Sequence, residues 1–288
     1  MNFNLTEEQI MLQQTISDFA KKEIAPGAAS LDANAEFPSE NIKKMAELGL
    51  MGMMVPTSLG GGGMSVLDYV IVLEEVAAAC ASTAVTMSVN NSLFLSCLMQ
   101  FANEEQKQKY IPDWAAGKCL GAYSLSEPGS GSDAAALRVT AKKSGENYIL
   151  AGTKNWITNG PHADAIIVFA RTSADKHKGV SAFIVEKDFP GFSIGKIEKK
   201  LGICASSTSE LNLNNCEVPA QNLLGQEGDG FKIAMATLDG GRIGIGAQAI
   251  GIARSAFETA AKYSAEREAF GKPINKFQGI QWKLADMA

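Results

Sequence analysis

The chain has 288 residues, 46% hydrophobic and 20% charged, a length that predicts about two domains. Its 26 basic and 31 acidic residues give a net charge of −5, so no sequence-wide basic field favours nucleic acid or anionic lipid. No apolar run approaches the roughly 18 residues of a membrane-spanning helix, and no export signal opens the chain, which predicts a cytoplasmic protein without nucleic-acid or membrane partners.

The first third of the chain has helical patterns. Thr6 followed by Gln9 forms a capping box that predicts a helix start, and we expect this helix to end at Pro26-Gly27. Further helices are predicted from Ser39, from Ser65, over 83–101, and from Asn103 to Trp114. Residues 1–117 are therefore expected to form an N-terminal α-helical domain.

The middle of the chain changes to short apolar runs rich in β-branched residues. Such runs, separated by turns and not by long helices, predict an antiparallel sheet or barrel. We expect a middle antiparallel β domain over residues 118–227. Its predicted strands are 119–125, 139–143, 148–151, 165–171, 180–187, 192–194 and 210–218.

Helical periodicity returns at Phe231 and continues to about Glu266, and a new helix starts near Phe277. Glycines within the long helix, each costing about 1 kcal/mol relative to alanine, indicate close approach of another backbone or a flat ligand. One long helix and a fragment cannot enclose a core. We therefore expect residues 228–288 to begin a C-terminal α-helical domain that continues beyond Ala288, which makes the chain an α+β multidomain protein.

Metal and hydrolase sites have no convincing residues. The five cysteines form no C-x-x-C pair, and the two histidines, His162 and His177, lie in segments rich in turn formers. A zinc site needs four close N or S ligands and a Ser-His-Asp hydrolase needs a well-placed histidine. We expect no metal and interpret the cysteines as buried free thiols.

A glycine-rich segment over residues 126–134 matches G-x-G-x-x-A at Gly129, Gly131 and Ala134. A dinucleotide-binding fold requires a substantial helix after this motif, and residues 134–137 are too few to form one. A tight turn of glycine and serine can still bind phosphate through its backbone N–H groups.

Three other segments allow two interpretations each. Trp156 in a strand is more often a core residue, but beside a phosphate-binding loop its indole, with the hydroxyl of Thr158, would suit a flat heteroaromatic ring. Asp239-Gly240-Gly241-Arg242 could be close helix packing with a surface ion pair. The segment from Arg267 to Gln278 could be a solvated connection.

Taken together and in this order, the segments resemble the acyl-CoA dehydrogenase family, and specifically its short-chain, butyryl-CoA dehydrogenase-like branch. The resemblance spans the whole chain and implies a fold of helical, β and helical domains. It is carried by residues 123–133 (YSLSEPGSGSD), 156–160 (WITNG), 239–242 (DGGR) and 267–274 (REAFGKPI), with Phe277-Gln278.

The resemblance implies FAD as cofactor. Leu125 and Ser126 would lie near the pyrimidine edge of the flavin, and Ser132 near the pyrophosphate and the acyl-CoA. Trp156 would cover one flavin face, and Thr158 would hydrogen-bond the nitrogen that receives hydride. The implied FAD-binding set is Tyr123, Leu125, Ser126, Gly131, Ser132, Trp156, Ile157, Thr158, Arg267, Phe270 and Gln278.

The resemblance also implies a substrate and partners. Ser132, Asp239, Gly240, Gly241 and Arg242 would contact the acyl-CoA. Arg267 and Gln278 would reach the FAD of a neighbouring subunit in a homotetramer. Electron transferring flavoprotein would be the electron acceptor.

The implied activity is dehydrogenation of a short acyl-CoA to a trans-2-enoyl-CoA, which requires a carboxylate base for the α-proton. The family's glutamate base would lie beyond Ala288, and the position that supplies it in other branches is Gly241 here. We therefore assign no catalytic residue and expect the chain alone to be inactive. Two alternatives stay open: a non-catalytic flavin- or acyl-CoA-binding protein, and a flavin oxidase or monooxygenase on the same scaffold.

Overall fold

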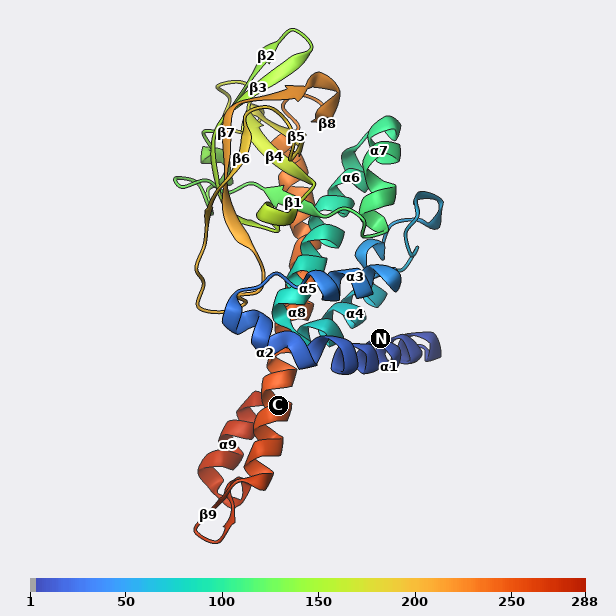
Figure 1. The fold of residues 1–288 in the computed structure, drawn as a ribbon, viewed down its shortest axis with the longest axis vertical. Helices are drawn as coiled ribbons and strands as arrows, with labels where there is room; N and C mark the ends of the chain where they lie inside the picture. The colour runs from blue at the N-terminus through green and yellow to red at the C-terminus, as the bar shows by residue number, and fades with distance from the viewer. Residues whose placement is uncertain (1–3) are drawn as a thin grey trace.

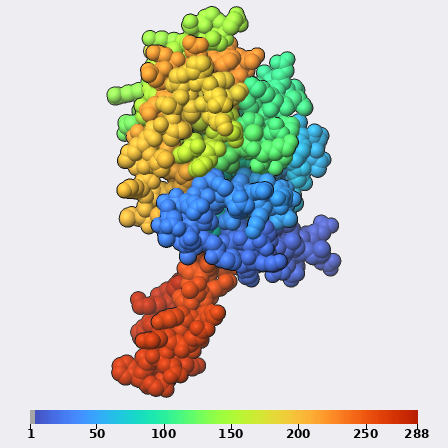
Figure 2. All heavy atoms as spheres, in the orientation of Figure 1, coloured from blue at the N-terminus to red at the C-terminus, as the bar shows by residue number. Residues whose placement is uncertain are grey.

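The computed structural model describes residues 4–288. Along the chain it forms a helical part, an eight-stranded sheet and a second helical part, as the sequence predicted (Figure 1). The long helix α8 (Gly230–Glu266) runs through the body and continues out of it. With α9 (Gln278–Met287) it forms an arm that projects from the rest of the molecule (Figure 2).

The helical part before the sheet begins its helices where the capping motifs predicted. At Thr6, Ser65 and Asn103 the side chain accepts a hydrogen bond from the backbone N–H three residues further on. The side chain of that later residue accepts a hydrogen bond from the backbone N–H of the capping residue. The segments are α1 (Glu7–Phe19), η1 (Ala20–Ile24), α2 (Ala25–Asn34), α3 (Ser39–Glu47), α4 (Val66–Ala79), α5 (Ala81–Ser88), η4 (Val89–Leu95), α6 (Ser96–Phe101) and α7 (Glu104–Ala115).

The prediction that Pro26-Gly27 ends the first helix is wrong. The chain continues from α1 through the π-helical segment η1 into α2, which ends at the left-handed residue Ala35. Pro26 lies in the first turn of α2, directly after the π-helical segment η1. The proline therefore lies inside a continuous helical run and does not end it.

The middle part is one mixed sheet in the order β6-β7-β3-β2-β4-β5-β8, with β1 paired to β4. The antiparallel pairing expected from the sequence holds for most neighbours, but β1 runs parallel to β4, as does the single pair Thr140–Arg171. The strands are β1 (Gly121–Ser124), β2 (Thr140–Ser144), β3 (Asn147–Thr158), β4 (Ala165–Arg171), β5 (Val180–Glu186), β6 (Phe192–Ile197), β7 (Thr208–Pro219) and β8 (Leu223–Leu224).

Close packing explains two of the glycines in α8. A Cβ on Gly244 would lie 2.7 Å from the Tyr69 hydroxyl, and one on Gly251 would collide with the backbone of Glu74. Both contacts are with α4, so Gly251 lets α8 approach the backbone of α4 and Gly244 makes room for the Tyr69 side chain. After α8 the chain forms the short hairpin of β9 (Glu268–Ala269) and β10 (Lys272–Pro273), then α9.

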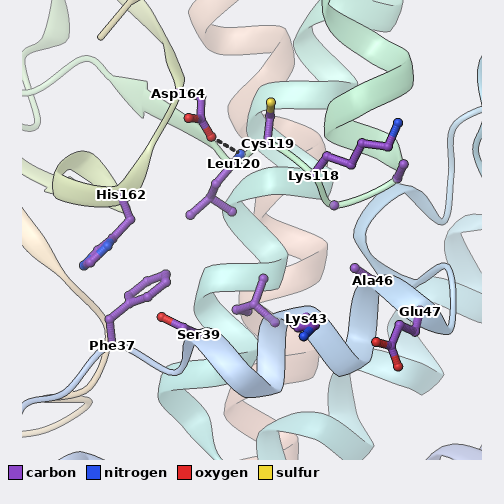
Figure 3. Close-up of a pocket in the computed structure, with 13 residues that line it drawn as sticks. Phe37, Ser39, Lys43, Ala46, Glu47, Lys118, Cys119, Leu120, His162 and Asp164 are labelled. Atoms are coloured by element: carbon purple, nitrogen blue, oxygen red, sulfur yellow. Dashed lines mark hydrogen bonds between the residues drawn. The ribbon is translucent and has the colours of Figure 1, made fainter.

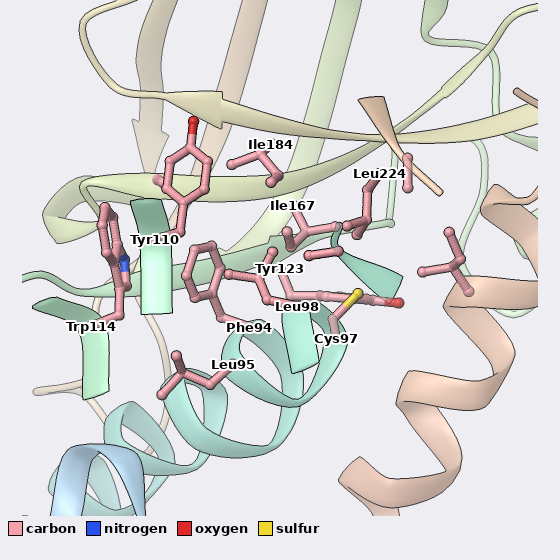
Figure 4. Close-up of a cluster of buried hydrophobic side chains, with 14 of the residues drawn as sticks. Phe94, Leu95, Cys97, Leu98, Tyr110, Trp114, Tyr123, Ile167, Ile184 and Leu224 are labelled. Atoms are coloured by element: carbon pink, nitrogen blue, oxygen red, sulfur yellow. The ribbon is translucent and has the colours of Figure 1, made fainter. Parts of the chain in front are cut away.

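A hydrophobic core joins the sheet to the helices on both sides of it in sequence. Phe94 and Leu98 pack with Tyr123 of β1 and Ile167 of β4 (Figure 4). This core fixes β1 against the helical part, which sets the position of the loop that follows β1. Within residues 4–288 no helix is long and apolar enough to cross a membrane.

Candidate flavin and acyl-CoA site

The end of β3 carries an exposed tryptophan on a strained backbone. The β3–β7 register shifts between Lys154 and Ile157, and at this bulge Trp156 has φ 58° and is 57% exposed. Bulges redirect side chains, and a left-handed conformation costs a residue with Cβ about 1–2 kcal/mol. Ile157 is buried in its place, at 2% exposure, so the indole is not a core residue.

Asn159 fixes the end of β3 against two other elements. Its buried side-chain Nδ2 donates to the carbonyl oxygens of Thr86 in α5, at 3.1 Å, and Gly121 in β1, at 3.2 Å. Its backbone N–H donates to Ser207 O at 3.0 Å. The half-buried Thr158, which precedes it and pairs with Thr208, is therefore held at a defined distance from β1.

The glycine-rich loop lies directly beside this strand. Ser126 O accepts from Asn155 N at 2.9 Å, and Glu127 and Ser130 exchange backbone hydrogen bonds of 2.9 and 3.1 Å. Leu125 and Ser126 are half-buried, whereas Gly131 and Ser132 are exposed. The structure therefore places Ser126 directly beside the strand segment that carries Trp156, with Leu125 preceding it in the chain.

Tyr123, one of the predicted FAD-binding residues, lies in the hydrophobic core between the sheet and the helices. Its ring packs at 5.0 Å from Phe169, and its hydroxyl donates to Ala234 O of α8 at 3.3 Å. Burial raises the pKa of Tyr123 well above its usual value. Its side chain therefore belongs to the core (Figure 4), and its predicted part in cofactor binding stays a prediction.

The sequence analysis missed a buried ion pair beneath the loop. Lys154 Nζ lies 2.9 Å from Glu127 Oε1 and donates to Leu125 O at 3.0 Å. Burial lowers the pKa of Lys154 to about 8, although Glu127 acts in the opposite direction. One signal was present: Lys154 has the same strand parity as the inward-facing Tyr148 and Leu150.

A cleft of about 370 Å³ lies between η4 and α8. The exposed Arg242 and Ile245 form its mouth, and the buried Gly241 lies against Leu93. Asp239 and Gly240 are exposed one turn away, with Asp239 and Arg242 in a 3.9 Å surface pair. No Asp or Glu is among the described residues that line it, which are Ser88, Val89, Ser92, Leu93, Leu238, Gly241, Arg242 and Ile245.

A wider hollow of about 590 Å³ between α3 and residues 116–120 contains none of the predicted site residues (Figure 3). At its edge His162 stacks on Phe37 with ring centroids 3.8 Å apart, and burial lowers the pKa of His162. Asp164 accepts from Leu120 N and pairs with Lys187 at 2.8 Å. The stacking of His162 on Phe37 joins the sheet to the helical part. These structural contacts explain His162 and Asp164 without a ligand-binding role.

Arg267, Phe270 and Gln278 lie on the arm and are exposed. Phe270 is 95% exposed, with φ 53°. In Figure 1 the hairpin β9 and the helix α9 lie at the opposite end of the molecule from β3. The structure does not bring these three residues to Trp156 of the same chain.

The polar surroundings of Thr158 fit a ring with hydrogen-bonding edges. Within the described residues, 4–288, the three buried hydroxyls of Ser124, Ser207 and Ser209 find no hydrogen-bond partner, and neither does Oδ1 of Asn159. Ser124 ends β1, Asn159 follows Thr158, and Ser209 pairs with Ile157. A flavin combines a flat apolar face for Trp156 with polar edges for groups of this kind.

Three family models match consecutive parts of the chain. They are the acyl-CoA dehydrogenase N-terminal domain over residues 6–118, the middle domain over 122–216 and the C-terminal domain over 228–288. The chain belongs to the acyl-CoA dehydrogenase family. This confirms the predicted family.

Relatives place this acyl-CoA dehydrogenase chain near the short-chain enzymes. It is 52% identical to the mitochondrial short-chain specific acyl-CoA dehydrogenase of Mus musculus, covering 99% of this chain and 69% of the relative. It is 49% identical to the short-chain specific acyl-CoA dehydrogenase of Clostridium acetobutylicum, covering 100% of this chain and 76% of the relative.

The chain also matches solved structures along nearly its whole length. Butyryl-CoA dehydrogenase from Megasphaera elsdenii is 44% identical with a TM-score of 0.96, covering 100% of this chain and 76% of that one. A chain in a structure described as the electron transferring flavoprotein of Acidaminococcus fermentans is 48% identical with a TM-score of 0.97, covering 99% and 76%. An acyl-CoA dehydrogenase from Bacillus anthracis complexed with FAD is 40% identical with a TM-score of 0.92, covering 98% and 48%.

Proposed function

We propose that the chain forms the flavin- and thioester-binding part of a FAD-dependent dehydrogenase that converts a short acyl-CoA to a trans-2-enoyl-CoA. The observation that carries the proposal is the exposed, strained Trp156 beside Thr158, in a chain about half identical to short-chain acyl-CoA dehydrogenases. When bound, FAD accepts the β-hydrogen of the substrate as hydride.

The residues at the end of β3 would hold and shield the cofactor. The Trp156 indole would cover one flavin face and exclude water from it, and the Thr158 hydroxyl would donate a hydrogen bond at the ring edge. Leu125 and Ser126 would lie along the edge of the ring, and Ser132 would offer its hydroxyl to a phosphate. Ile157 would support the platform from within the core.

The cleft at α8 would receive the acyl-CoA. Arg242 at its mouth offers a cation and five N–H donors to an otherwise acidic protein. Gly241 leaves room between α8 and Leu93, because a Cβ there would lie 2.8 Å from Leu93 Cδ2. Asp239 and Gly240 would line the approach to the cleft.

Removal of the α-proton requires a desolvated carboxylate beside the thioester. Among the described residues the cleft lining has none, and the nearby Asp239 is solvated, with its side chain 81% exposed. We therefore infer that residues 1–288 bind the reactants but do not remove the proton. This absence also favours the second candidate, a non-catalytic flavin- or acyl-CoA-binding protein.

The arm residues and the expected partners complete the proposal. Arg267, Phe270 and Gln278 are exposed and belong to the arm, whose β9 and α9 lie at the opposite end of the molecule from β3 (Figure 1), so they would contact FAD on a neighbouring subunit of a homotetramer. Electron transferring flavoprotein would take the electrons from the reduced flavin. We propose the cytoplasm as the location.

The test is to load the purified chain with FAD, add butyryl-CoA, and follow the flavin absorption spectrum and turnover with an artificial electron acceptor. We expect FAD and butyryl-CoA to bind and turnover to stay at background. Failure to bind either ligand would contradict the proposed function. Turnover above background would instead overturn the inference that these residues lack a base, and rapid reoxidation of reduced flavin by oxygen would point to the oxidase alternative.

A further inference from the structure

Lys154 and Glu127 form an ion pair with both side chains buried, at 0% and 6% exposure, and no other ion pair found in residues 4–288 has this property. Burying two charges carries a desolvation penalty that their attraction often fails to offset. Apolar residues of similar volume would often be as stable or more stable at such a place. Stability alone is therefore a weak explanation for this pair.

The pair joins three segments around the glycine-rich loop. Lys154 in β3 donates to Leu125 O, at the start of the loop, and Glu127 lies within the loop. The other bonds of the Glu127 carboxylate come from the backbone N–H groups of Arg138, at 2.6 Å, and Val139, at 3.0 Å. One side-chain pair thus links β3 to the start of the loop and to residues 138–139, which follow the loop.

The same pair lies immediately before the bulge of Trp156. Asn155, between Lys154 and Trp156, donates its backbone N–H to Ser126 O at 2.9 Å. A left-handed backbone such as that of Trp156 persists only where its surroundings fix it. The contacts of Lys154 and Asn155 with the loop fix the residues directly before Trp156, and the pairing of Ile157 with Ser209 fixes the one after it.

We propose that Lys154 and Glu127 are positioning residues for the flavin, because their ion pair fixes the loop of residues 125–133 against the bulge that carries Trp156. The inference rests on the proposed function. In this role neither residue touches the cofactor. Together they set the spacing between the Trp156 indole and the phosphate-binding loop.

The experiment compares Lys154→Met and the double variant Lys154→Met/Glu127→Gln with Val218→Ala. Val218 is a buried residue of the same sheet that pairs with Tyr148, at the other end of β3, so it controls for lost stability. For each protein we would measure the melting temperature, amide exchange at Asn155 and residues 125–130 without FAD, the FAD dissociation constant, and the visible circular dichroism of bound flavin.

We expect both Lys154 variants to bind FAD about tenfold or more weakly, with altered flavin circular dichroism and faster exchange at Asn155. The double variant should recover thermal stability without recovering FAD affinity, because it removes the unpaired buried charge but not the lost connection. Val218→Ala should lower the melting temperature and leave the other three measurements unchanged.

Lys154 variants that behave like Val218→Ala, with reduced stability but unchanged affinity, spectrum and exchange, would overturn the inference and leave the proposed function intact. Failure of the unmodified chain to bind FAD would overturn the proposed function, and this inference with it.

Discussion

The side-chain amide of Asn159 donates a 3.2 Å hydrogen bond to the carbonyl oxygen of Gly121 and so joins the end of β3 to the start of β1. The same Nδ2 donates to Thr86 O in α5. Asn159 adopts φ 65°, a conformation that asparagine tolerates better than most residues. One buried amide therefore fixes Thr158 relative to the loop after β1.

Replacing Asn159 by alanine should lower the free energy of unfolding by about 3 kcal/mol, because two buried carbonyls lose their donor and alanine is strained in the left-handed region. Urea unfolding measures this change. The control is Asn34→Ala, an exposed residue that bonds only within its helix, which should change stability by at most about 0.5 kcal/mol. Equal effects of the two substitutions would contradict the role given to Asn159.

Replacing Trp156 by glycine should lower the free energy of unfolding by no more than about 1 kcal/mol, because glycine adopts φ 58° without strain and this gain offsets much of the burial lost with the partly exposed indole. A tryptophan in a core costs about 3–5 kcal/mol when truncated. Urea unfolding of the FAD-free protein separates these outcomes. A decrease in the free energy of unfolding of about 3–5 kcal/mol would show that the indole is a packing residue.

Introducing a carboxylate at the cleft should create activity. Gly241→Glu, combined with Leu93→Ala to make room for the new side chain, should raise turnover of butyryl-CoA about 100-fold or more above the unmodified chain, since a positioned general base contributes about 10²–10⁴-fold. The matched control is Gly241→Gln in the same background. If glutamate and glutamine give the same rate while both variants bind butyryl-CoA, the cleft is not where the α-carbon lies.

The stability of the protein should depend on the protonation of Lys154. Burial lowers its pKa from 10.5 to about 8 in the folded state, although the contact with the charged Glu127 acts to raise it. Between these two values the unfolded chain binds more protons, so Lys154 adds stability as the pH rises. Its penalty is fully present below pH 8.

The expected gain from Lys154 between pH 8 and 10.5 is about 3 kcal/mol. Urea unfolding of the unmodified chain and of Lys154→Met at each pH isolates this contribution. The groups that titrate alike in both proteins cancel when one free energy of unfolding is subtracted from the other. A difference between the two proteins that does not change with pH would contradict the lowered pKa.

Local signals in the sequence predicted much of the fold. The capping boxes at Thr6, Ser65 and Asn103 depend on contacts three residues apart, and all three are confirmed. Pro26 misled because a proline fits the first turn of a helix as well as the point after its end. The continuous passage through η1 depends on tertiary packing that the sequence pattern does not contain.

The site was harder to predict because one bulge changes the strand parity. Simple alternation from Tyr148 and Leu150 would direct Trp156 inward, as a core residue. The bulge after Lys154 directs Ile157 inward and exposes Trp156. The two interpretations of the tryptophan could therefore be separated only by the structure. Lys154 precedes the bulge and keeps the inward parity of Tyr148 and Leu150, but its partner Glu127 lies in a separate segment whose proximity the local pattern does not show.

The most direct test of the account is a titration of FAD into the FAD-free chain, followed by tryptophan fluorescence. We predict saturable quenching in the unmodified protein and in Trp282→Phe, which removes an exposed indole on α9, and loss of that quenching in Trp156→Gly. Absence of saturable quenching in the unmodified chain, or equal quenching in Trp156→Gly, would contradict the claim that Trp156 is the flavin platform.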